Sequence, residues 1–514
     1  MCDHHLPRLD RRALLAAGAG ATAAVVVPPT LTTPAAAGAV PTSYHFAGRF
    51  GGVQAPWHYL PFEVPTGVQA IDVSYDFQPL ETGLGFTANV VDIGIFDQDG
   101  TALGSAAGFR GWSGGARRSF RVATDSATPG YLAGPIEPGE WRVALGPFAV
   151  VPPGVDWTVD VTLTYGAATP APEPTPPPRA VVGTGEGWYR GDLHLHTVHS
   201  DGRHTQASLV ALAREAGLDF IGSSEHNTSS APLTWGAHVS DAEPPLVVCG
   251  EEVTTRNGHW IAAGVPAGTW IDWRYTDRAT LARFTQQVQG LGGLAVACHP
   301  WAPTPGSTWG FGLDLKGMDA VELWNGPWTA DDQVAVVQWH TWLTTGRFVP
   351  AVGSSDSHHT GQVVGKPHTV VRASTLSVPA IVDGLRGGRS WLAESSAVGL
   401  TFEASADGRT ATCGERLGAR GGQLVPVRLE VTGAPRCVAQ VLGPLAPLGG
   451  ALTDDTGRAI VTVTVPTALA PWVRAEVRRL DTPFEVNPLE GVPALQMVAL
   501  TNPIRLTGSW AARA

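Results

Sequence analysis

The sequence predicts a multidomain protein in which a central α/β domain is flanked by two β-domains. A chain of 514 residues is too long for one ordinary hydrophobic core and corresponds to about three domains of roughly 150 residues each. Apolar and polar residues alternate near both ends of the chain, which is typical of half-buried antiparallel strands. In the middle, short apolar runs alternate with helical stretches instead.

The N-terminal residues 1–39 predict an export signal. Arg11 and Arg12 precede a weakly hydrophobic run from Ala13 to Val27, and Ala37 to Ala39 is a small-residue cleavage site. Twin arginines are typical of the Tat route, so we expect a secreted or envelope-associated protein. The run falls short of the roughly 20 residues of a spanning helix, so a membrane anchor is the less favoured alternative and the mature chain is expected to lack a transmembrane segment.

Residues 40–167 are predicted to form a β-sandwich, because polar and apolar residues alternate from Ala70 to Phe77 and from Trp157 to Thr164. Residues 168–186 are predicted as a linker, since proline dominates its first half and disfavours both helix and strand ladder. After about residue 398 the alternation returns, which predicts a second β-sandwich over residues 398–514.

Residues 187–397 are predicted as the α/β domain, with parallel strands in a barrel or a doubly wound sheet. In such folds functional side chains gather where strands end and loops begin. The predicted helices are Gln206–Gly217, Arg278–Leu291, Ala330–Gly346 and Val378–Gly387.

The charge and the cysteines limit the function classes. A formal net charge of -11 disfavours a nucleic-acid partner, because binding there depends on neutralising phosphates. An exported protein can oxidise its thiols, and Cys413 and Cys437 are the favoured disulfide pair because they share one strand-rich region. Cys249 and Cys298 precede site segments, where we expect small buried side chains.

Side chains that can bind metal ions concentrate in the central domain, which holds twelve of the sixteen histidines between residues 190 and 370. In an extended segment residues two apart face the same side, so His194 with His196, and Asp356 with His358, can each grip one ion. Nitrogen and oxygen ligands suit Zn, Mn or Fe and argue against a structural thiolate zinc. The candidates are His194, His196, Asp201, His226, Glu252, His299, Asp356 and His358.

The segments that carry these residues resemble the polymerase-and-histidinol-phosphatase (PHP) superfamily. The matching segments occur in the family's order over about 210 residues. The flanking β-domains, the opening segment Trp188–Asp192 and the closing segment Leu500–Ile504 resemble the exported CehA/McbA-like branch, which includes carbaryl hydrolases. The remaining matching segments are His194–Gly202, Glu225–Asn227, Gly250–Glu252, Gly258–His259, His299–Pro300, Glu322–Asn325 and Gly353–His358.

The resemblance implies a distorted (β/α)7 barrel that holds two to three divalent ions. His194, His196, Glu252 and Asp356 would bind the first ion. The second would be bound by Glu252, His299 and His259, and the third by Asp201, His226 and His358. Glu252 would thus bridge two ions, and Glu252 and Asp356 are expected to be catalytic. The chain departs from the family at Glu225, where aspartate is common, and we expect Glu225 to orient its neighbours rather than to bind an ion. Its neighbour on the strand, Glu251, should face away from Glu252.

Three ions favour a phosphoester substrate, because a phosphoryl group presents several anionic oxygens whereas a carbonyl ester presents one. The expected function is therefore an exported metal-dependent phosphoesterase that uses a metal-bridging hydroxide on a small organic phosphate or lipid headgroup. Hydrolysis of carboxylic or carbamate esters is the alternative. A third hypothesis is a surface-binding protein whose β-domains contact a glycan or the envelope while the central domain is inert.

The remaining candidates concern proton transfer and substrate binding. His199 is the predicted proton donor, with His359 and His368 as alternatives, although a solvent-facing or supporting role is open for each. Arg256 and Asn325 are predicted to hold anionic or hydroxyl groups of the substrate. Trp324 is predicted to line an apolar or cationic headgroup pocket, with core packing as the alternative. The same alternatives apply to Trp301, Trp309 and Trp328.

Overall fold

The computed structural model divides into two compact units. The first contains residues up to Pro174 together with two short segments, 198–201 and 226–230, and the second contains the rest of the chain from Thr175. The boundary therefore falls inside the predicted linker. The predicted export signal lies outside the described residues. The structure describes residues 42–52, 55–81, 87–167, 169–304, 306–483 and 495–511.

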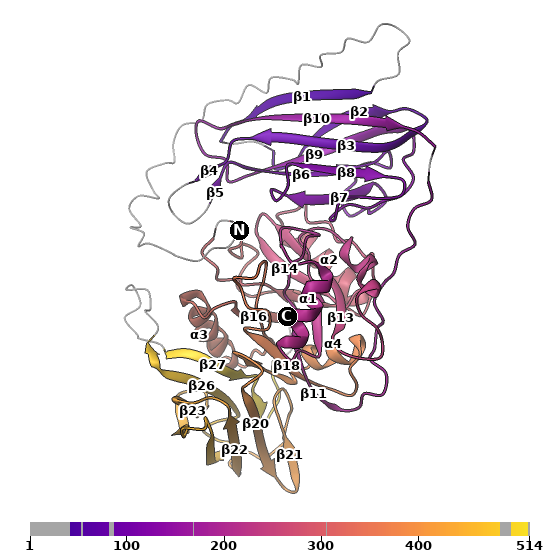
Figure 1. Ribbon diagram of the computed structural model, residues 1–514. Helices are drawn as coiled ribbons and strands as arrows, with labels where there is room; N and C mark the ends of the chain where they lie inside the picture. Colours follow the sequence, from indigo (N-terminus) through magenta and orange to yellow (C-terminus); the bar gives the residue numbers. More distant parts are fainter. Residues whose placement is uncertain are drawn as a thin grey trace. The chain divides into compact units, whose positions relative to one another are not determined.

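The first unit contains the predicted β-sandwich, with two antiparallel four-stranded sheets (Figure 1). One sheet has the order β1-β10-β3-β8, and the other has the order β2-β9-β6-β7. Two short strands, β4 and β5, form a separate antiparallel pair. The strands are β1 Ser43–Phe50, β2 His58–Val64, β3 Val68–Phe77, β4 Leu80–Glu81, β5 Thr87–Ala88, β6 Val90–Phe96, β7 Phe109–Gly114, β8 Ser119–Ala123, β9 Gly139–Phe148 and β10 Val155–Tyr165.

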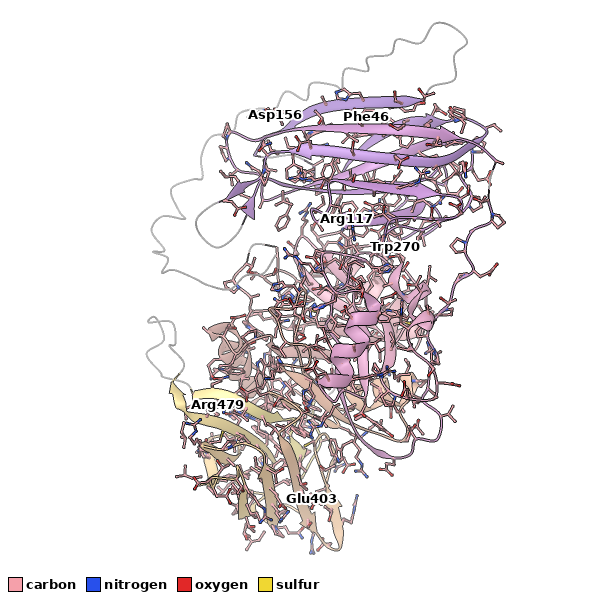
Figure 2. The ribbon with its side chains drawn as sticks, viewed as in Figure 1. Phe46, Arg117, Asp156, Trp270, Glu403 and Arg479 are labelled. Atoms are coloured by element: carbon pink, nitrogen blue, oxygen red, sulfur yellow. The ribbon has the colours of Figure 1, made fainter. Side chains whose placement is uncertain are left out.

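The alternation of the sequence explains the core of this sandwich. Along β10, residues Val155, Trp157, Val159, Val161 and Leu163 are buried, whereas most residues between them are exposed. Figure 2 labels two side chains from its first sheet: the buried Phe46 on β1 and the exposed Asp156 on β10. Apolar side chains from both sheets contribute to one hydrophobic core.

The second unit is built on a long mixed sheet that contains all the strands of the predicted α/β domain. Its first part has the order β17-β16-β15-β14-β13-β12-β11-β18-β19. The pairs β11–β12, β12–β13, β15–β16 and β16–β17 are parallel. The strands are β11 Gly187–Asp192, β12 Phe220–Ser223, β13 Leu246–Thr255, β14 Gly258–Ala263, β15 Leu294–Ala297, β16 Ala320–Asn325, β17 Ala351–Ser354, β18 His368–Ala373 and β19 Ser390–Ala393.

The four predicted helices are confirmed to within two residues at each end. Two of them begin at side-chain caps, because Thr205 accepts from the Ser208 amide and Asp277 accepts from the Thr280 amide. No α-helix among the described residues combines the length and the apolar character needed to span a membrane. The helices are α1 Gln206–Glu215, α2 Arg278–Gly290, α3 Ala330–Thr344 and α4 Val378–Arg386, and two 3₁₀ turns, η1 Ala231–Leu233 and η2 Trp235–Ala237, lie between β12 and β13.

The regular (β/α)7 alternation implied by the resemblance is not confirmed. The described residues contain four α-helices, and β14 runs antiparallel to both of its neighbours. β11 and β18 are also antiparallel. The connection after β12 is rich in proline, glycine and serine and forms two 3₁₀ turns, while the segment between β17 and β18 has no helix. These two connections therefore lack the helices that seven strand–helix repeats would require.

The predicted C-terminal β-sandwich is continuous with the central sheet rather than a separate compact unit. Strand β19 pairs with β27, which continues the long sheet through β26, β23 and β24. The Asn502 side chain adds hydrogen bonds to both main-chain groups of Ala351 and to Ser390. The second sheet has the order β21-β20-β22-β25. The strands are β20 Gly399–Ala406, β21 Arg409–Ala411, β22 Leu424–Thr432, β23 Cys437–Leu442, β24 Pro447–Leu452, β25 Ala459–Pro466, β26 Trp472–Pro483, β27 Leu495–Thr501 and β28 Ile504–Arg505.

The expected Cys413–Cys437 disulfide is wrong in this structure, where both residues are buried free thiols. Cys413 follows β21 in one sheet of the C-terminal sandwich, whereas Cys437 begins β23 in the other sheet. Burial raises the pKa of the Cys413 thiol to about 12 and so suppresses its reactive thiolate. Cys249 and Cys298 are also buried free thiols, as expected for small packing side chains.

Candidate metal centre

The candidate metal ligands of the second unit come from strand ends. His194 and His196 follow β11, His299 follows β15, and Asp356 follows β17. Glu252 lies within β13 itself. His299 and Asp356 have positive φ angles of 28° and 50°, which are uncommon for residues with side chains and occur where surrounding structure imposes them. Because the ends of parallel strands lie at the same edge of a sheet, ligands that are far apart in sequence come together there.

Four side chains form the first ligand group, and all four atoms are buried. His194 Nε2 lies 3.2 Å from Glu252 Oε2 and 3.2 Å from Asp356 Oδ1, and His196 Nε2 lies 3.4 and 3.1 Å from the same two oxygens. Four ligands placed about 2.0 Å from a tetrahedral ion are separated by about 3.3 Å, so these spacings fit a zinc-sized cation. His194 Nε2 and Asp356 Oδ1 form no hydrogen bond within the described residues.

A second ligand group shares Glu252 through its other oxygen. His259 Nδ1 lies 2.9 Å from Glu252 Oε1, and His299 Nε2 lies 3.5 Å from the same atom. The two imidazole rings are 5.2 Å apart and nearly perpendicular. His259 reaches the group from β14, which pairs with β13 in antiparallel register. Because the two oxygens of Glu252 face different histidines, this carboxylate has the geometry of a bridge between two ions.

The remaining candidates are Asp201 and His226 in the first compact unit and His358 in the second. In the first unit, His226 Nε2 lies 3.6 Å from Asp201 Oδ1, and both side chains are partly exposed. In the second unit, the rings of His196 and His358 stack with centroids 4.1 Å apart. His358 Nδ1 donates to the carbonyl oxygen of Asp356 at 2.8 Å, so its Nε2 keeps the lone pair that a metal needs. Asp201 and His226 thus offer one oxygen and one nitrogen donor, and His358 offers one nitrogen donor, which are the donor types predicted for a third ion.

The electrostatics of the cluster favour a bound cation. Burial by itself would lower the pKa of His194, but the charges of Asp356, Glu252 and Glu322 outweigh burial and hold it well above its usual value. Conversely, burial would raise the pKa of Asp356, yet His194, His196 and His358 hold it well below its usual value. A charged carboxylate in such a buried site needs either protons on the neighbouring histidines or a cation beside it.

Two buried carboxylates support the ligands and were not predicted as site residues. His194 Nδ1 donates to Glu322 Oε1 at 3.3 Å, which directs His194 Nε2 toward the cluster, and Glu322 Oε2 also accepts from the His299 amide. Asp192 accepts from the amides of Ser355 and His194, and burial raises its pKa to about 6. The sequence signal was present, because Asp192 and Glu322 both stand in the segments that resemble the PHP superfamily.

Glu225, predicted to orient its neighbours rather than to bind an ion, lies in such a position. Its carboxylate accepts from the amide and the hydroxyl of Thr197, the latter at 2.6 Å. Thr197 directly follows the ligand His196, so Glu225 fixes the backbone beside it. Glu251 faces away from Glu252, as expected for neighbours on a strand: it accepts from the Ile271 amide, and burial holds its pKa well above the usual value.

Glu322→Gln is expected to weaken binding of the first ion about 10–100-fold, because the change keeps the hydrogen-bond acceptor but removes the charge behind His194. The measurement is a titration of the metal-free protein with Zn²⁺ in competition with a chromophoric chelator. Glu403→Gln, a change of the same kind on β20 outside the ligand groups, should bind as the wild type does. An unaltered affinity of the Glu322→Gln protein would refute the supporting role.

The predicted proton donors and substrate-binding residues lie in different parts of the structure, and Asn325 among them contacts the first ligand group. His199 lies in the first unit, where its Nδ1 is 2.9 Å from Ser230 Oγ. His359 accepts from the Gly361 amide in the loop after β17. Asn325 donates to Glu322 at 2.9 Å and to Asp356 Oδ2 at 3.4 Å, which ties it to the first ligand group. Arg256 lies in the turn between β13 and β14, outside the ligand groups.

The tryptophans favour core packing over a pocket wall. Trp324 is 2% exposed and packs edge to face on Trp328 with ring centroids 5.3 Å apart. Trp309 and Trp328 are also buried, whereas Trp301 is half-buried against Trp342. The burial of Trp324 and its contact with Trp328 thus favour the core-packing alternative over contact with the substrate.

His368 is a buried neutral hydrogen-bond acceptor rather than a proton donor. Its Nδ1 donates to the Gly365 carbonyl, so its Nε2 accepts from Arg190 Nη1 at 3.0 Å. Burial lowers its pKa to about 4, and the adjacent Arg190 charge lowers it too. A group this difficult to protonate cannot deliver a proton near neutral pH.

Because the pKa of His368 is lower in the folded than in the unfolded chain, its contribution to stability is present above about pH 6.5. That contribution is lost as the pH falls from about 6.5 to about 4, and the difference corresponds to about 3 kcal/mol. Replacing His368 with glutamine should therefore flatten the decline of the thermal midpoint over this range. Calorimetry of both proteins at pH 4 to 7 tests this, and parallel pH curves would contradict it.

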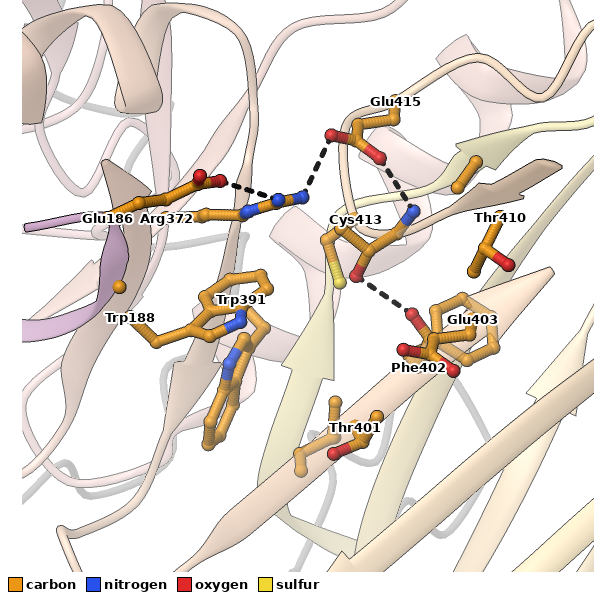
Figure 3. Close-up of a pocket in the computed structure, with 14 residues that line it drawn as sticks. Glu186, Trp188, Arg372, Trp391, Thr401, Phe402, Glu403, Thr410, Cys413 and Glu415 are labelled. Atoms are coloured by element: carbon orange, nitrogen blue, oxygen red, sulfur yellow. Dashed lines mark hydrogen bonds and ion pairs between the residues drawn. The ribbon is translucent and has the colours of Figure 1, made fainter. Parts of the chain in front are cut away.

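A cavity in the second unit is distinct from the ligand groups. It has a volume of about 540 Å³ and lies among β11, β18, β19 and the β20–β21 hairpin (Figure 3). Arg372 in its wall is paired with Glu186 at 2.6 Å and with Glu415 at 3.2 Å. With Glu403 added, three carboxylates line the cavity against one guanidinium. This acidic lining disfavours a phosphate ligand and sets the cavity apart from the metal centre.

Comparison with known proteins gives distant likenesses. No protein-family model matches the chain. An uncharacterised protein of Methanocaldococcus jannaschii is 26% identical over 150 residues, which are 26% of this chain and 81% of that protein. A two-domain protein of Bacteroides vulgatus, described as containing a predicted PHP-like metal-dependent phosphoesterase, is 17% identical; the match covers 65% of this chain and all of that one, with a TM-score of 0.32.

An amidohydrolase of Chromobacterium violaceum is also 17% identical, and the match covers 34% of this chain and 89% of that one with a TM-score of 0.25. TM-scores this low do not establish a common fold. The class of the protein is therefore defined by its own structure: a multidomain, β-rich chain with a buried cluster of histidines and carboxylates suited to divalent metal ions.

Proposed function

We propose that the protein is a metal-dependent hydrolase of the PHP type, and that it cleaves phosphoesters, either diesters or monoesters, of a small organic phosphate or lipid headgroup. The observation that carries the proposal is the Glu252 carboxylate. One of its oxygens faces His194 and His196, and the other faces His259 and His299. A buried carboxylate shared by two sets of imidazoles is the arrangement expected for two adjacent cations.

The donor set fits divalent ions of the zinc, manganese or iron kind. His194, His196, Glu252 and Asp356 would hold the first ion, and Glu252, His259 and His299 the second. The sequence-based assignment of a third ion to Asp201, His226 and His358 is part of the proposal. When bound, such ions activate water as a nucleophile and neutralise charge on the substrate oxygens. The ligands proposed for these ions are imidazoles and carboxylates, which favours hard or borderline cations.

The other side chains of the site have supporting tasks. Glu322 and Asn325 hold His194 and Asp356 in place, and Asp192 fixes the Ser355 amide next to Asp356. His199 remains the proposed proton donor to the leaving group, with Nδ1 oriented by Ser230. Arg256 is proposed to bind an anionic substrate oxygen, since its guanidinium can form two parallel hydrogen bonds with a phosphate.

The proposal also covers the setting of the enzyme. Export by the Tat route, with a secreted or envelope-associated product, rests on the sequence of residues 1–39. Contact of the β-domains with a glycan or with the envelope rests on the presence of a β-domain before and after the central domain in the sequence. A nucleic-acid substrate is disfavoured by the net charge of -11.

The test is a substrate panel with protein loaded with Zn²⁺, Mn²⁺ or Fe²⁺. Bis(p-nitrophenyl) phosphate and p-nitrophenyl phosphate are the phosphoester probes, and naphthyl carbamates and p-nitrophenyl acetate are the ester probes. We expect at least one phosphoester to be cleaved in a metal-dependent manner and the esters to be cleaved far more slowly. Turnover of the carbamate alone would overturn the phosphoesterase proposal in favour of the carbaryl-hydrolase type, which the CehA/McbA-like resemblance supports.

A further inference from the structure

The Asp201–His226 pair is built into the first compact unit, together with the β-sandwich. The two segments that carry the pair, 198–201 and 226–230, belong to this unit, although the sequence assigns both to the central domain. Their residues Ser200, Thr228, Ser229 and Ser230 are all buried. The proximity of Asp201 and His226 therefore depends on contacts inside this unit.

Gly130 of the sandwich is the main point of attachment. Its carbonyl oxygen accepts from Thr228 Oγ1 at 2.8 Å, and its amide donates to Ser230 Oγ at 3.2 Å. Thr228 and Ser230 lie two and four residues after His226, so this short segment is tied at two points to the backbone of a single residue. Ser230 Oγ is also 2.9 Å from His199 Nδ1, which links the second segment to the same point.

The backbone at Gly130 admits no side chain. Its φ of +100° lies in a region that residues with a Cβ rarely adopt, and a Cβ would lie 2.7 Å from the His199 carbonyl oxygen and 3.0 Å from that of Trp112. The glycine therefore allows the close approach of segment 198–201. The next residue, Tyr131, is anchored in the sandwich core, stacked on Phe120 at 4.0 Å and hydrogen-bonded to Ser113 at 2.8 Å.

Arg117 provides an independent attachment from the connection between β7 and β8. Its guanidinium donates to the carbonyl oxygen of Val198, three residues before Asp201. Figure 2 labels Arg117. Each of the two ligand-bearing segments is thus held by hydrogen bonds from a different part of the sandwich, and neither Arg117 nor Gly130 offers a metal ligand itself.

We propose that the β-sandwich is a positioning element for the Asp201–His226 pair: Gly130 and Arg117 hold these two side chains in the mutual geometry that lets them bind the third ion. This inference rests on the proposed function, since it presupposes that the Asp201–His226 pair binds metal. It assigns the N-terminal sandwich a task in catalysis without any contact to the substrate. Loss of these attachments should release the third ion and leave the first two in place.

The experiment measures the metal content of the full-length protein by mass spectrometry after loading with excess Zn²⁺ and gel filtration. Thr228→Val removes the hydroxyl donor to Gly130 at nearly unchanged volume, and Arg117→Ala removes the other attachment. We expect three ions per chain in the wild type and two in each variant. Arg117→Lys, which keeps a donor for Val198, should restore the third ion. Gly130→Ala is a further variant, and Thr228→Val keeps the test decisive if Gly130→Ala does not fold.

Thr124→Val is the matched control, because Thr124 is another buried threonine of the same unit whose hydroxyl ties down a distant residue, Thr169. It should retain three ions. Variants of Thr228 and Arg117 that keep three ions with wild-type affinity would overturn the inference. A wild type that binds two ions and still cleaves phosphoesters would overturn the inference but not the proposed function. Selective loss of the third ion, in a protein that cleaves no phosphoester, would support the inference and overturn the proposed function.

Discussion

Glu252→Gln is expected to abolish binding of both the first and the second ion and to lower kcat/KM on the order of a thousandfold, because metal ions supply several kcal/mol of charge stabilisation in such reactions. The carboxylate contributes one oxygen to each ligand group and is one of the two carboxylate ligands proposed for the two cations. A glutamine offers one neutral oxygen and turns an N–H toward the other group. Metal content and phosphoester kinetics, measured on the same preparation, test this expectation.

Glu251→Gln is the matched control on the neighbouring residue of β13. Burial and the nearby Asp272 hold the pKa of Glu251 well above its usual value, so its surroundings favour the protonated carboxyl group. A glutamine has nearly the same shape as a protonated glutamate and keeps the acceptor for the Ile271 amide. The control should therefore retain metal and activity. If Glu252→Gln behaved like Glu251→Gln, the bridging role would be refuted.

Asp356→Asn is expected to have the second-largest effect, weakening the first ion and lowering kcat/KM by about a hundredfold or more. The substitution removes one charged ligand that lies 3.1–3.2 Å from the two histidine nitrogens. Asparagine is the appropriate replacement, because Asp356 has a φ of +50° and asparagine tolerates that region better than alanine does. The effect can therefore be attributed to the charge rather than to the backbone.

Asp407→Asn provides the corresponding control. Asp407 also has a φ of +50°, but it lies in the turn between β20 and β21 and contacts Gln423 rather than any candidate ligand. Its substitution should leave metal content and kinetics unchanged. Equal metal affinity of the Asp356→Asn protein and the wild type, measured by chelator competition, would show that Asp356 is not a ligand of the first ion.

The ligand cluster is the part of the molecule that the sequence predicts best. His194, His196, Glu252, His299 and Asp356 follow or end apolar runs, and parallel strands bring such positions to one edge of a sheet. The four helices were also predictable from the sequence, because helix caps and apolar periodicity are local features of the chain. Local chemistry at Thr205 and Asp277 fixes two of the helix starts whatever the rest of the chain does.

Features that depend on distant pairing were not predictable. The continuity of β19 with β27 joins segments about 100 residues apart, and nothing in either strand specifies its partner. Trp324 is adjacent to the site in sequence, yet its place on β16 turns it into the core. The attachment of segments 198–201 and 226–230 to Gly130 likewise depends on tertiary contacts, and the glycine alone gives no sign of its partner.

Anomalous diffraction from crystals of the zinc-loaded protein is the decisive test of the proposed pair of ions around Glu252. We expect a zinc peak about 2 Å from His194 Nε2, His196 Nε2, Glu252 Oε2 and Asp356 Oδ1, and a second peak at a similar distance from Glu252 Oε1. Protein that was loaded with excess metal and showed no peak among these atoms, while its side chains stayed in place, would contradict it.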